Sequence, residues 1–230
     1  MVMRCSIIIP VLNEAETIAD CLEELQVFRR AGHELIVVDG GSVDNTTELA
    51  RSKVDRIVTA STGRARQMNA GAQAADGEAL LFLHADTFLP ATAMSDIAQA
   101  LDATHKVWGC FAVRLSGRQP VFRLIEWMMN TRSCLTGIIT GDQAMFMRRE
   151  VFDAVNGFDD LPLMEDIAMS KKLRRCSRPA CLRTRVITSS RRWERHGIFR
   201  TVLLMWSLRL RYWLGVSPHV LVQSYYRESS

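Results

Sequence analysis

The stretch Ser6-Ile-Ile-Ile-Pro-Val-Leu-Asn-Glu14 decides the fold of this 230-residue chain. Its β-branched run predicts a buried strand that ends at a proline and then presents an amide and a carboxylate before a helix. Three later runs, Glu34–Val38, Arg56–Thr59 and Ala79–Leu83, also read as strands, with helical patterns between them. This alternation predicts an α/β domain with a mixed, mostly parallel sheet and helices on both faces.

Polar residues follow the predicted strands at the edge where such sheets bind ligands. Asn13 follows the first strand, and Asp39 ends the second within Val37-Val-Asp-Gly-Gly-Ser-Val-Asp44. Asp39 is suited to accept hydrogen bonds from a base or a ribose. Asn13 suits a helix N-cap equally well, and an Asp-Gly pair is usually only a turn.

The fourth strand leads into Leu81-Phe-Leu-His-Ala-Asp-Thr87, which presents Asp86 at its exposed end. A carboxylate there can hold Mg²⁺ or Mn²⁺ while diphosphate oxygens supply other ligands. The structural alternative is that Asp86 caps the helix expected after Pro90.

The remainder of the chain is expected to continue the domain. After the helix that follows Pro90, the patterns predict a strand near Val107–Leu115, a helix around Val121–Met129, a strand at Ala144–Met147, a helix near Arg149–Val155 that ends at Asn156-Gly157, a helix beginning between Leu163 and Asp166, and a last helix over Ile198–Leu214.

Composition favours one core, because the chain is 48% hydrophobic and short. We expect one domain over residues 1–196 and a C-terminal amphipathic helix and tail over residues 197–230. The six cysteines show no CxxC pair, and no export signal or membrane-spanning run is visible, since Arg200, Arg209 and Arg211 interrupt the most apolar late stretch. A cytoplasmic location fits these features.

Charge is distributed unevenly. The net charge is +4, yet residues 171–230 contain 14 Lys and Arg against 2 acids. A basic segment can meet nucleic acid, anionic lipid or a phosphorylated substrate, and charge alone does not choose among them.

The last predicted helix has an apolar stripe of Phe199, Leu203, Trp206, Leu210 and Trp213. The stripe either packs on the domain core or lies on an anionic membrane surface beside the flanking arginines.

Taken together, the motifs after the first, second and fourth strands resemble those of the family-2 glycosyltransferases of GT-A fold, which is Rossmann-like. The resemblance is greatest to small bacterial members associated with radical-SAM or selenodomain proteins. It extends over nearly the whole chain, through Gly63-Arg-Ala-Arg-Gln-Met-Asn-Ala-Gly71, Gly141-Asp-Gln-Ala144, Leu163-Met-Glu-Asp166, Ser190-Arg-Arg-Trp193 and Gly215-Val-Ser-Pro218.

The resemblance implies a role for several residues at the donor site. Those expected to line the nucleoside side are Pro10, Asn13, Glu14, Asp39 and Ser42, whereas Arg64 would approach the diphosphate and Asp86 would bind the metal. One departure from the family pattern is visible, since His84-Ala85-Asp86 stands where the family has DxD. His84 either ligates Mn²⁺ or packs under the nucleotide, and packing is favoured.

The acidic pair Glu165-Asp166 matches the family's catalytic pair, in which the aspartate takes the proton from the acceptor hydroxyl. The alternative is that both acids only favour the helix macrodipole. Arg191 and Arg192 stand near a QxxRW-like element whose glutamine is absent here, and one of them would neutralise the leaving diphosphate. Trp193 would stack on a sugar or on the acceptor, or else anchor a basic strand edge.

The resemblance thus implies an inverting, metal-dependent transfer of sugar from a nucleoside diphosphate sugar, with UDP favoured, to an acceptor hydroxyl in a lipid or the cell envelope. The cofactor would be Mg²⁺ or Mn²⁺, and no nucleic-acid partner is expected. A non-catalytic nucleotide-sugar-binding protein or membrane adaptor is the alternative. A nicotinamide oxidoreductase is disfavoured, because Pro10-Val-Leu-Asn-Glu14 occupies the place of GxGxxG.

Overall fold

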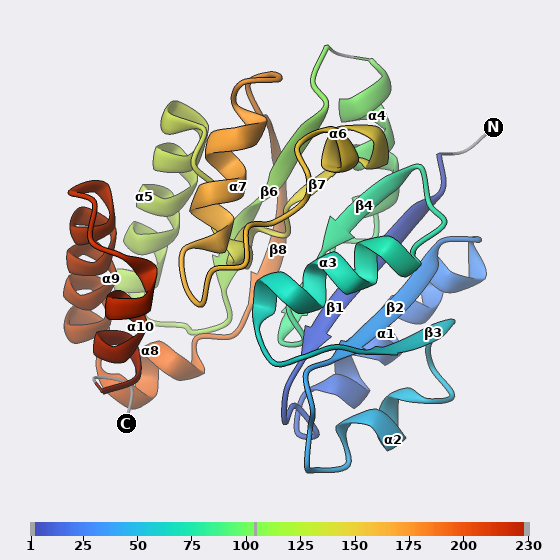
Figure 1. Cartoon of the computed structure of the whole chain (residues 1–230), viewed down its shortest axis with the longest axis horizontal. Helices are drawn as coiled ribbons and strands as arrows, with labels where there is room; N and C mark the ends of the chain where they lie inside the picture. The colour runs from blue at the N-terminus through green and yellow to red at the C-terminus, as the bar shows by residue number, and fades with distance from the viewer. Residues whose placement is uncertain (1–2, 104, 228–230) are drawn as a thin grey trace.

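The structure, a computed structural model, describes residues 3–103 and 105–227, without the side chains of residues 192, 196, 226 and 227. At its centre lies one sheet with the strand order β3-β2-β1-β4-β7-β6-β8-β5 (Figure 1). The strands are β1 Cys5–Val11, β2 Glu34–Asp39, β3 Arg56–Thr59, β4 Ala79–Phe82, β5 Thr87–Phe88, β6 Trp108–Leu115, β7 Phe146–Arg148 and β8 Ala180–Thr188.

The first four strands are all parallel, as the sequence predicts. Beyond β4 the sheet becomes mixed, because β7 is antiparallel to both β4 and β6. β6 and β8 are parallel, and the short β5 is antiparallel to β8. The mixed, mostly parallel α/β architecture that the sequence predicts is therefore confirmed.

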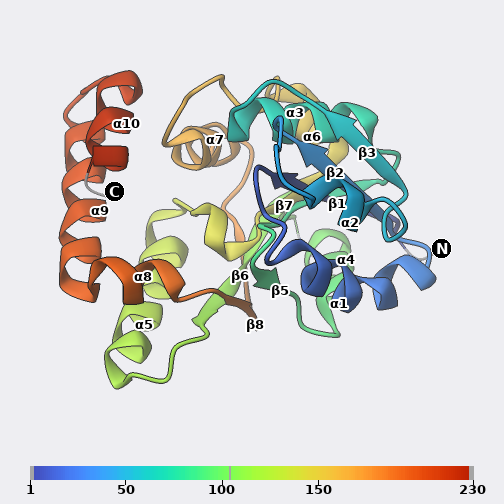
Figure 2. The same cartoon turned by 90° about the horizontal axis from the view of Figure 1, so that it is seen from below.

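Helices cover both faces of the sheet. They are α1 Ile18–Arg30, α2 Thr46–Ala50, α3 Arg64–Ala74, α4 Ala93–Asp102, α5 Pro120–Thr136, α6 Arg149–Ala154, α7 Glu165–Leu173, α8 Arg191–His196, α9 Ile198–Trp213 and α10 Pro218–Arg227, with a 3-10 turn, η1, at Gly141–Gln143. Figure 2 shows α3, α6 and α7 on one side of the sheet and α1, α4 and α5 on the other.

The side-chain alternation of β1 separates two cores. Ile7 and Ile9 pack with α1 and α4, whereas Ile8 packs with α3 and α7. All three are fully buried. Because successive strand side chains point to opposite faces, one continuous apolar run supplies both cores.

The segment 63–71 explains how the strand ends are held in place. Gln67 donates from its amide nitrogen to the carbonyl oxygens of Val11 and Val38, at 2.8 and 2.9 Å, and so ties β1 to β2. Gly71 allows α3 to lie against the sheet, since a Cβ at this position would stand 2.4 Å from Cγ2 of Ile8. The motif at residues 63–71 therefore fixes the ends of β1 and β2 relative to each other.

The structure excludes several structural alternatives that the sequence left open. Asn13 does not cap α1, because that helix begins at Ile18 with Thr17 at the N-cap position. Asp86 does not cap α4, for which Thr92 holds that position. Arg191-Arg-Trp193 forms the first turn of α8 rather than a strand edge. The sequence reading also missed β5, β8, α8 and α10.

Helix α9, predicted as the last helix, packs through the face opposite to its apolar stripe. Thr201, Leu204 and Leu208 are buried, and the two leucines join a small core with Met164 and Ile167. The stripe from Phe199 to Trp213 points outward, so the expectation that it packs on the domain core is wrong. Among the described helices, none has the length and apolarity needed to cross a membrane.

Candidate active site

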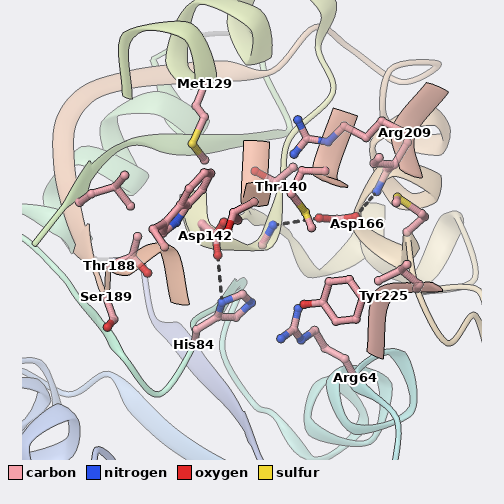
Figure 3. A pocket seen from close by; sticks show the side chains of 18 of the residues that line it. Arg64, His84, Met129, Thr140, Asp142, Asp166, Thr188, Ser189, Arg209 and Tyr225 are labelled. Atoms are coloured by element: carbon pink, nitrogen blue, oxygen red, sulfur yellow. Dashed lines mark hydrogen bonds and ion pairs between the residues drawn. The ribbon is translucent and has the colours of Figure 1, made fainter. Parts of the chain in front are cut away.

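A cavity of about 490 Å³ lies beyond the carboxyl ends of β1 and β4 (Figure 3). Its walls come from the loops after these strands, the start of α3, η1, and helices α5, α7 and α9. A volume of this size suits a small-molecule ligand. The polar residues that line it include Glu14, Arg64, His84, Asp86, Arg132, Asp142, Glu165, Asp166 and Arg209.

Six of the residues that the sequence suggested meet in this cavity: Pro10, Glu14, Arg64, Asp86, Glu165 and Asp166. They come from four separate segments of the sequence. The parallel strands β1 and β4 bring the segment with Pro10 and Glu14 next to the loop with Asp86. The sequence grouping of these residues therefore corresponds to one location in the structure, while their chemical roles stay predictions.

The loop after β2 is built from internal hydrogen bonds. The carboxylate of Asp39 accepts from the backbone N–H of Gly41 and of Ser42, the latter at 3.0 Å. Ser42 Oγ accepts from the N–H of Asn13, whose own amide oxygen accepts from the N–H of Val43 at 2.9 Å. These residues shape the loop beside the cavity and are not among its lining residues.

Of the two arginines at the start of α8, the structure places only the side chain of Arg191. Arg191 forms an ion pair with Glu16 at 3.5 Å and is not among the lining residues of the cavity. The side chain of Arg192 lies outside the described part of the chain. Trp193 does line the cavity and also packs beside a small apolar cluster around Phe122.

Asp142, which the sequence analysis did not single out, pairs with His84 across the cavity floor. The Nδ1 atom of His84 lies 3.5 Å from Oδ1 of Asp142. Burial by the surrounding protein would raise the pKa of Asp142, but the hydrogen bond and charge of His84, together with Arg64 and Arg209, lower it overall. The imidazole also lies against Gly141, where a Cβ would stand 2.6 Å from its Nε2 atom.

The acidic pair begins α7 after a strained turn. Met164 has a φ of 68°, which is costly for a residue with a side chain. Glu165 is buried, and its nearest cation is Arg64, at 3.8 Å between Nη1 and Oε1. Its pKa is raised, first by burial and second by the charge of Asp166, which Arg64 partly opposes.

Asp166 is held by the backbone. Its Oδ2 accepts from the N–H of Gly141 at 3.0 Å, and its Oδ1 accepts from the N–H of Ile167 at 2.7 Å. Figure 3 shows the carboxylate between the labelled side chains of Arg64 and Arg209. Two fixed amides therefore orient this carboxylate toward the cavity before any ligand binds.

Two more cations of the cavity, Arg132 of α5 and Arg209 of α9, were not predicted as site residues. Neither arginine belongs to one of the recognised motifs, which explains the omission. For Arg209 the sequence does carry a signal, because this arginine interrupts an otherwise apolar helix.

The fit of a divalent cation rests on Asp86. Its carboxylate lines the cavity, and its Oδ1 accepts a long hydrogen bond, 3.4 Å, from the hydroxyl of Thr87. Within the described residues, no three His, Cys, Asp or Glu side chains gather into a site that would hold a metal by themselves. One carboxylate and the oxygens of a diphosphate together fit Mg²⁺ or Mn²⁺, which seldom need a full set of protein ligands.

Two of the known proteins that are similar in sequence to this chain are glycosyltransferases. A poly(ribitol-phosphate) β-N-acetylglucosaminyltransferase, TarS of Staphylococcus aureus, is 30% identical over 112 residues, which are 45% of this chain and 20% of that protein. A PGL/p-HBAD biosynthesis glycosyltransferase of Mycobacterium bovis is 29% identical over 67% of this chain and 62% of its own length. The chain thus spans about a fifth of the first relative and less than two thirds of the second.

Solved structures share the fold. The structure of TarS residues 1–349 with UDP-GlcNAc has a TM-score of 0.65 at 21% identity, over 81% of this chain and 58% of that chain. The mannosyltransferase PcManGT from Pyrobaculum calidifontis, in complex with GDP-Man and Mn²⁺, has a TM-score of 0.61 at 22% identity, over 81% and 57%.

The sequence model described as glycosyl transferase family 2 matches residues 6–155, which hold β1, β4 and the loops that carry Asp39 and Asp86. This match covers more than half of the chain and includes the end of the sheet at which the cavity lies. The chain therefore belongs to glycosyl transferase family 2.

Proposed function

We propose that the protein transfers a sugar from a nucleoside diphosphate sugar to an acceptor hydroxyl, with inversion at the anomeric carbon. The observation that carries the proposal is Asp166, whose carboxylate is fixed by two backbone N–H groups in the cavity that Asp86 and Arg64 also line. A carboxylate held in this way suits a general base.

The donor is proposed to lie along β1, β4 and the start of α3. Pro10, Glu14 and the Asp39 loop, with Asn13 and Ser42, would surround the nucleoside, and Arg64 would face the diphosphate. UDP is the nucleotide we favour, with GDP as the other candidate. The similar structures that hold UDP-GlcNAc and GDP-Man support a nucleotide sugar as the donor class.

Asp86 is proposed to hold Mg²⁺ or Mn²⁺ together with the donor diphosphate, and the cation would supply charge neutralisation on the leaving group. The Mn²⁺ in the PcManGT complex supports this choice. The imidazole of His84 is engaged by Asp142, so we assign it to positioning η1 beneath the donor.

The chemistry assigned to the residues is a single displacement. Asp166 takes the proton of the acceptor hydroxyl. At the same time the oxygen of that hydroxyl bonds to the anomeric carbon, from the face opposite the diphosphate. The bond between that carbon and the diphosphate oxygen breaks, and the electron pair leaves with the nucleoside diphosphate. Arg64 opposes the charge that develops there, and Glu165 holds Arg64 in place.

Nucleotide-sugar turnover tests this proposal. A panel of UDP- and GDP-sugars is incubated with the protein and Mn²⁺, and both the melting temperature and the release of nucleoside diphosphate are measured. We expect one nucleotide series to raise the melting temperature by mass action and to be slowly hydrolysed when no acceptor is added. If no member of the panel stabilises the protein or is consumed, the proposed activity is wrong.

We also propose that α9 lies on an anionic membrane surface, where a lipid or cell-envelope acceptor would be found. The side chains of Phe199 and Trp213 are 79% and 76% exposed, and Leu203 and Leu210 lie between them on the same outward stripe. The basic composition of residues 171–230 is complementary to anionic lipid. The location would then be cytoplasmic and peripheral.

Vesicle sedimentation checks the membrane proposal. The protein should sediment with vesicles of phosphatidylglycerol and phosphatidylcholine, more strongly at low salt, and less with phosphatidylcholine alone. Phe199→Glu with Trp213→Glu should abolish binding without lowering the melting temperature, because both side chains are exposed. Val27→Glu, on the exposed side of α1, is the matched control. Equal sedimentation of the double variant and the wild type would contradict the proposal.

A further inference from the structure

Two guanidinium groups face the part of the cavity that the donor assignment leaves unused. Arg132 comes from α5 and Arg209 from α9, and both line the cavity. In Figure 1 these helices lie at the opposite end of the molecule from α1, α2 and β3. In Figure 3, Arg209 and Arg64 lie on different sides of Asp166.

The acids nearby are already engaged by other groups. Asp142 pairs with His84, and Asp166 accepts from the N–H groups of Gly141 and Ile167. Within the described residues, no ion pair of 4.0 Å or less joins Arg132 or Arg209 to an acid. Arg132 and Arg209 therefore lie near the carboxylates of Asp142 and Asp166, but form no ion pair with either of them among the described residues.

Arg132 is also short of hydrogen-bond partners. Its Nη2 donates to Ser133 Oγ at 3.1 Å, but its buried Nε has no acceptor among the described residues. An unsatisfied buried donor on a charged group costs free energy, and an anionic ligand would remove that cost.

Placing the two guanidinium groups together is itself unfavourable. The pKa of Arg132 is lowered to about 10, first by burial and second by the positive charge of Arg209, while the charges of Asp166 and Asp142 oppose the shift. Burial also lowers the pKa of Arg209, although the charges of Asp166 and Asp142 oppose the shift. A site that holds two partly desolvated cations near each other is suited to an oxyanion.

Building on the proposed sugar transfer, we infer that Arg132 and Arg209 bind an anionic group of the acceptor, a carboxylate or a phosphate, close to the hydroxyl that receives the sugar. The position of the pair supports the acceptor over the donor. Pro10 belongs to β1, Arg64 begins α3 and Asp86 lies in the loop after β4, whereas Arg132 and Arg209 come from α5 and α9. An acceptor anion bound there would place its neighbouring hydroxyl at the base.

The apolar surroundings refine the substrate class. Met129 of α5 and Val202, Met205 and Trp206 of α9 line the cavity beside the two arginines, and Trp206 is also 56% exposed on the outer stripe. An acceptor with an anionic group and an apolar portion would satisfy both kinds of lining.

The test is a titration with the donor site filled. Wild-type protein, Arg132→Gln and Arg209→Gln are first saturated with the nucleoside diphosphate that the wild type binds, plus Mn²⁺. Glycerol 3-phosphate is then titrated by calorimetry, with neutral glycerol as the comparison ligand. Arg175→Gln, which removes an exposed charge outside the cavity, is the matched control variant. Thermal melting establishes that each variant is folded.

We expect glycerol 3-phosphate, and not glycerol, to bind the loaded wild type and the control. Each cavity variant should bind it about 10- to 100-fold more weakly, the loss expected for one charge-assisted hydrogen-bonding group, with unchanged nucleotide affinity. Competition between glycerol 3-phosphate and the nucleotide, or lost nucleotide affinity in the variants, would assign the arginines to the donor diphosphate and overturn the inference. Absence of glycerol 3-phosphate binding to the loaded wild type would overturn it as well.

Saturation of the wild-type protein with a nucleoside diphosphate, the first step of the test, separates this inference from the proposed function. A wild-type protein that binds no nucleoside diphosphate contradicts sugar transfer, and with it the acceptor role of the arginines. Once nucleotide binding is established, the later results concern Arg132 and Arg209 alone.

Discussion

Asp166→Asn is expected to lower the rate of sugar transfer by about 10²–10⁴-fold while donor affinity stays nearly unchanged. The substitution keeps the size and shape of the side chain but removes its capacity to take a proton. The side-chain oxygen of asparagine still accepts a hydrogen bond from the N–H of Ile167. Its amide nitrogen would then face the N–H of Gly141 and cannot accept the hydrogen bond that Asp166 accepts there. Turnover and nucleotide-sugar affinity, measured separately on the same preparation, check the prediction.

Glu165→Gln is the matched comparison for this variant. Glu165 is buried against Arg64, so its amide should weaken the hold on Arg64 and reduce turnover much less than Asp166→Asn. If the two acids only favoured the helix macrodipole, both variants would lose stability by about 0.3–1 kcal/mol and remain active. Full transfer by Asp166→Asn would therefore remove this residue from the mechanism.

The strand-end residues were predictable because the fold itself groups them. A buried run such as Ser6–Val11 requires a sheet, and parallel strands bring their carboxyl ends to one edge. Pro10 and Asp86 follow from that rule once β1 and β4 are recognised, and both line the cavity. The acidic pair Glu165-Asp166 needed the family resemblance, since acids at the start of a helix are common in any protein.

The two cavity arginines that belong to helices could not be predicted from the positions of strand ends. Arg132 and Arg209 reach the cavity through the packing of α5 and α9, and no local pattern states which face of a helix meets a distant loop. The interaction of Asp142 with His84 was hidden for the same reason, because it joins η1 to the loop after β4. Residues 58 positions apart in sequence are paired only by the tertiary fold.

The two faces of α9 show how periodicity can mislead. The stripe from Phe199 to Trp213 is the more apolar one, yet Thr201, Leu204 and Leu208 form the buried face. The buried face is the one that meets Met164 and Ile167, and the sequence of the helix alone does not state where these partners lie. A strongly apolar face that stays exposed is a candidate for contact with another surface, which is why the outer stripe supports the membrane proposal.

Asp86→Ala is expected to abolish the Mn²⁺-dependent part of nucleoside diphosphate binding. Without this carboxylate, the described cavity has no protein ligand that we assign to the cation, and the diphosphate charge would meet Glu14 and Asp142 unscreened. For the wild type, a ligand at 100 times its Kd with Mn²⁺ present adds about 2.7 kcal/mol to the free energy of unfolding. For a chain of this size, each kcal/mol corresponds to roughly 2–4 °C in Tm, so the shift is measurable by thermal melting.

The control for this variant is Asp20→Ala, which removes an exposed acid from α1 and should leave the Mn²⁺-dependent shift intact. Asp86→Ala should melt at the same temperature with the nucleotide whether or not Mn²⁺ is added, since only the cation-dependent contribution is lost. A full Mn²⁺-dependent shift in Asp86→Ala would contradict the assignment. Because His84 and Asp142 face the same cavity, the combined replacement of these two residues would then decide whether they, rather than Asp86, hold the cation.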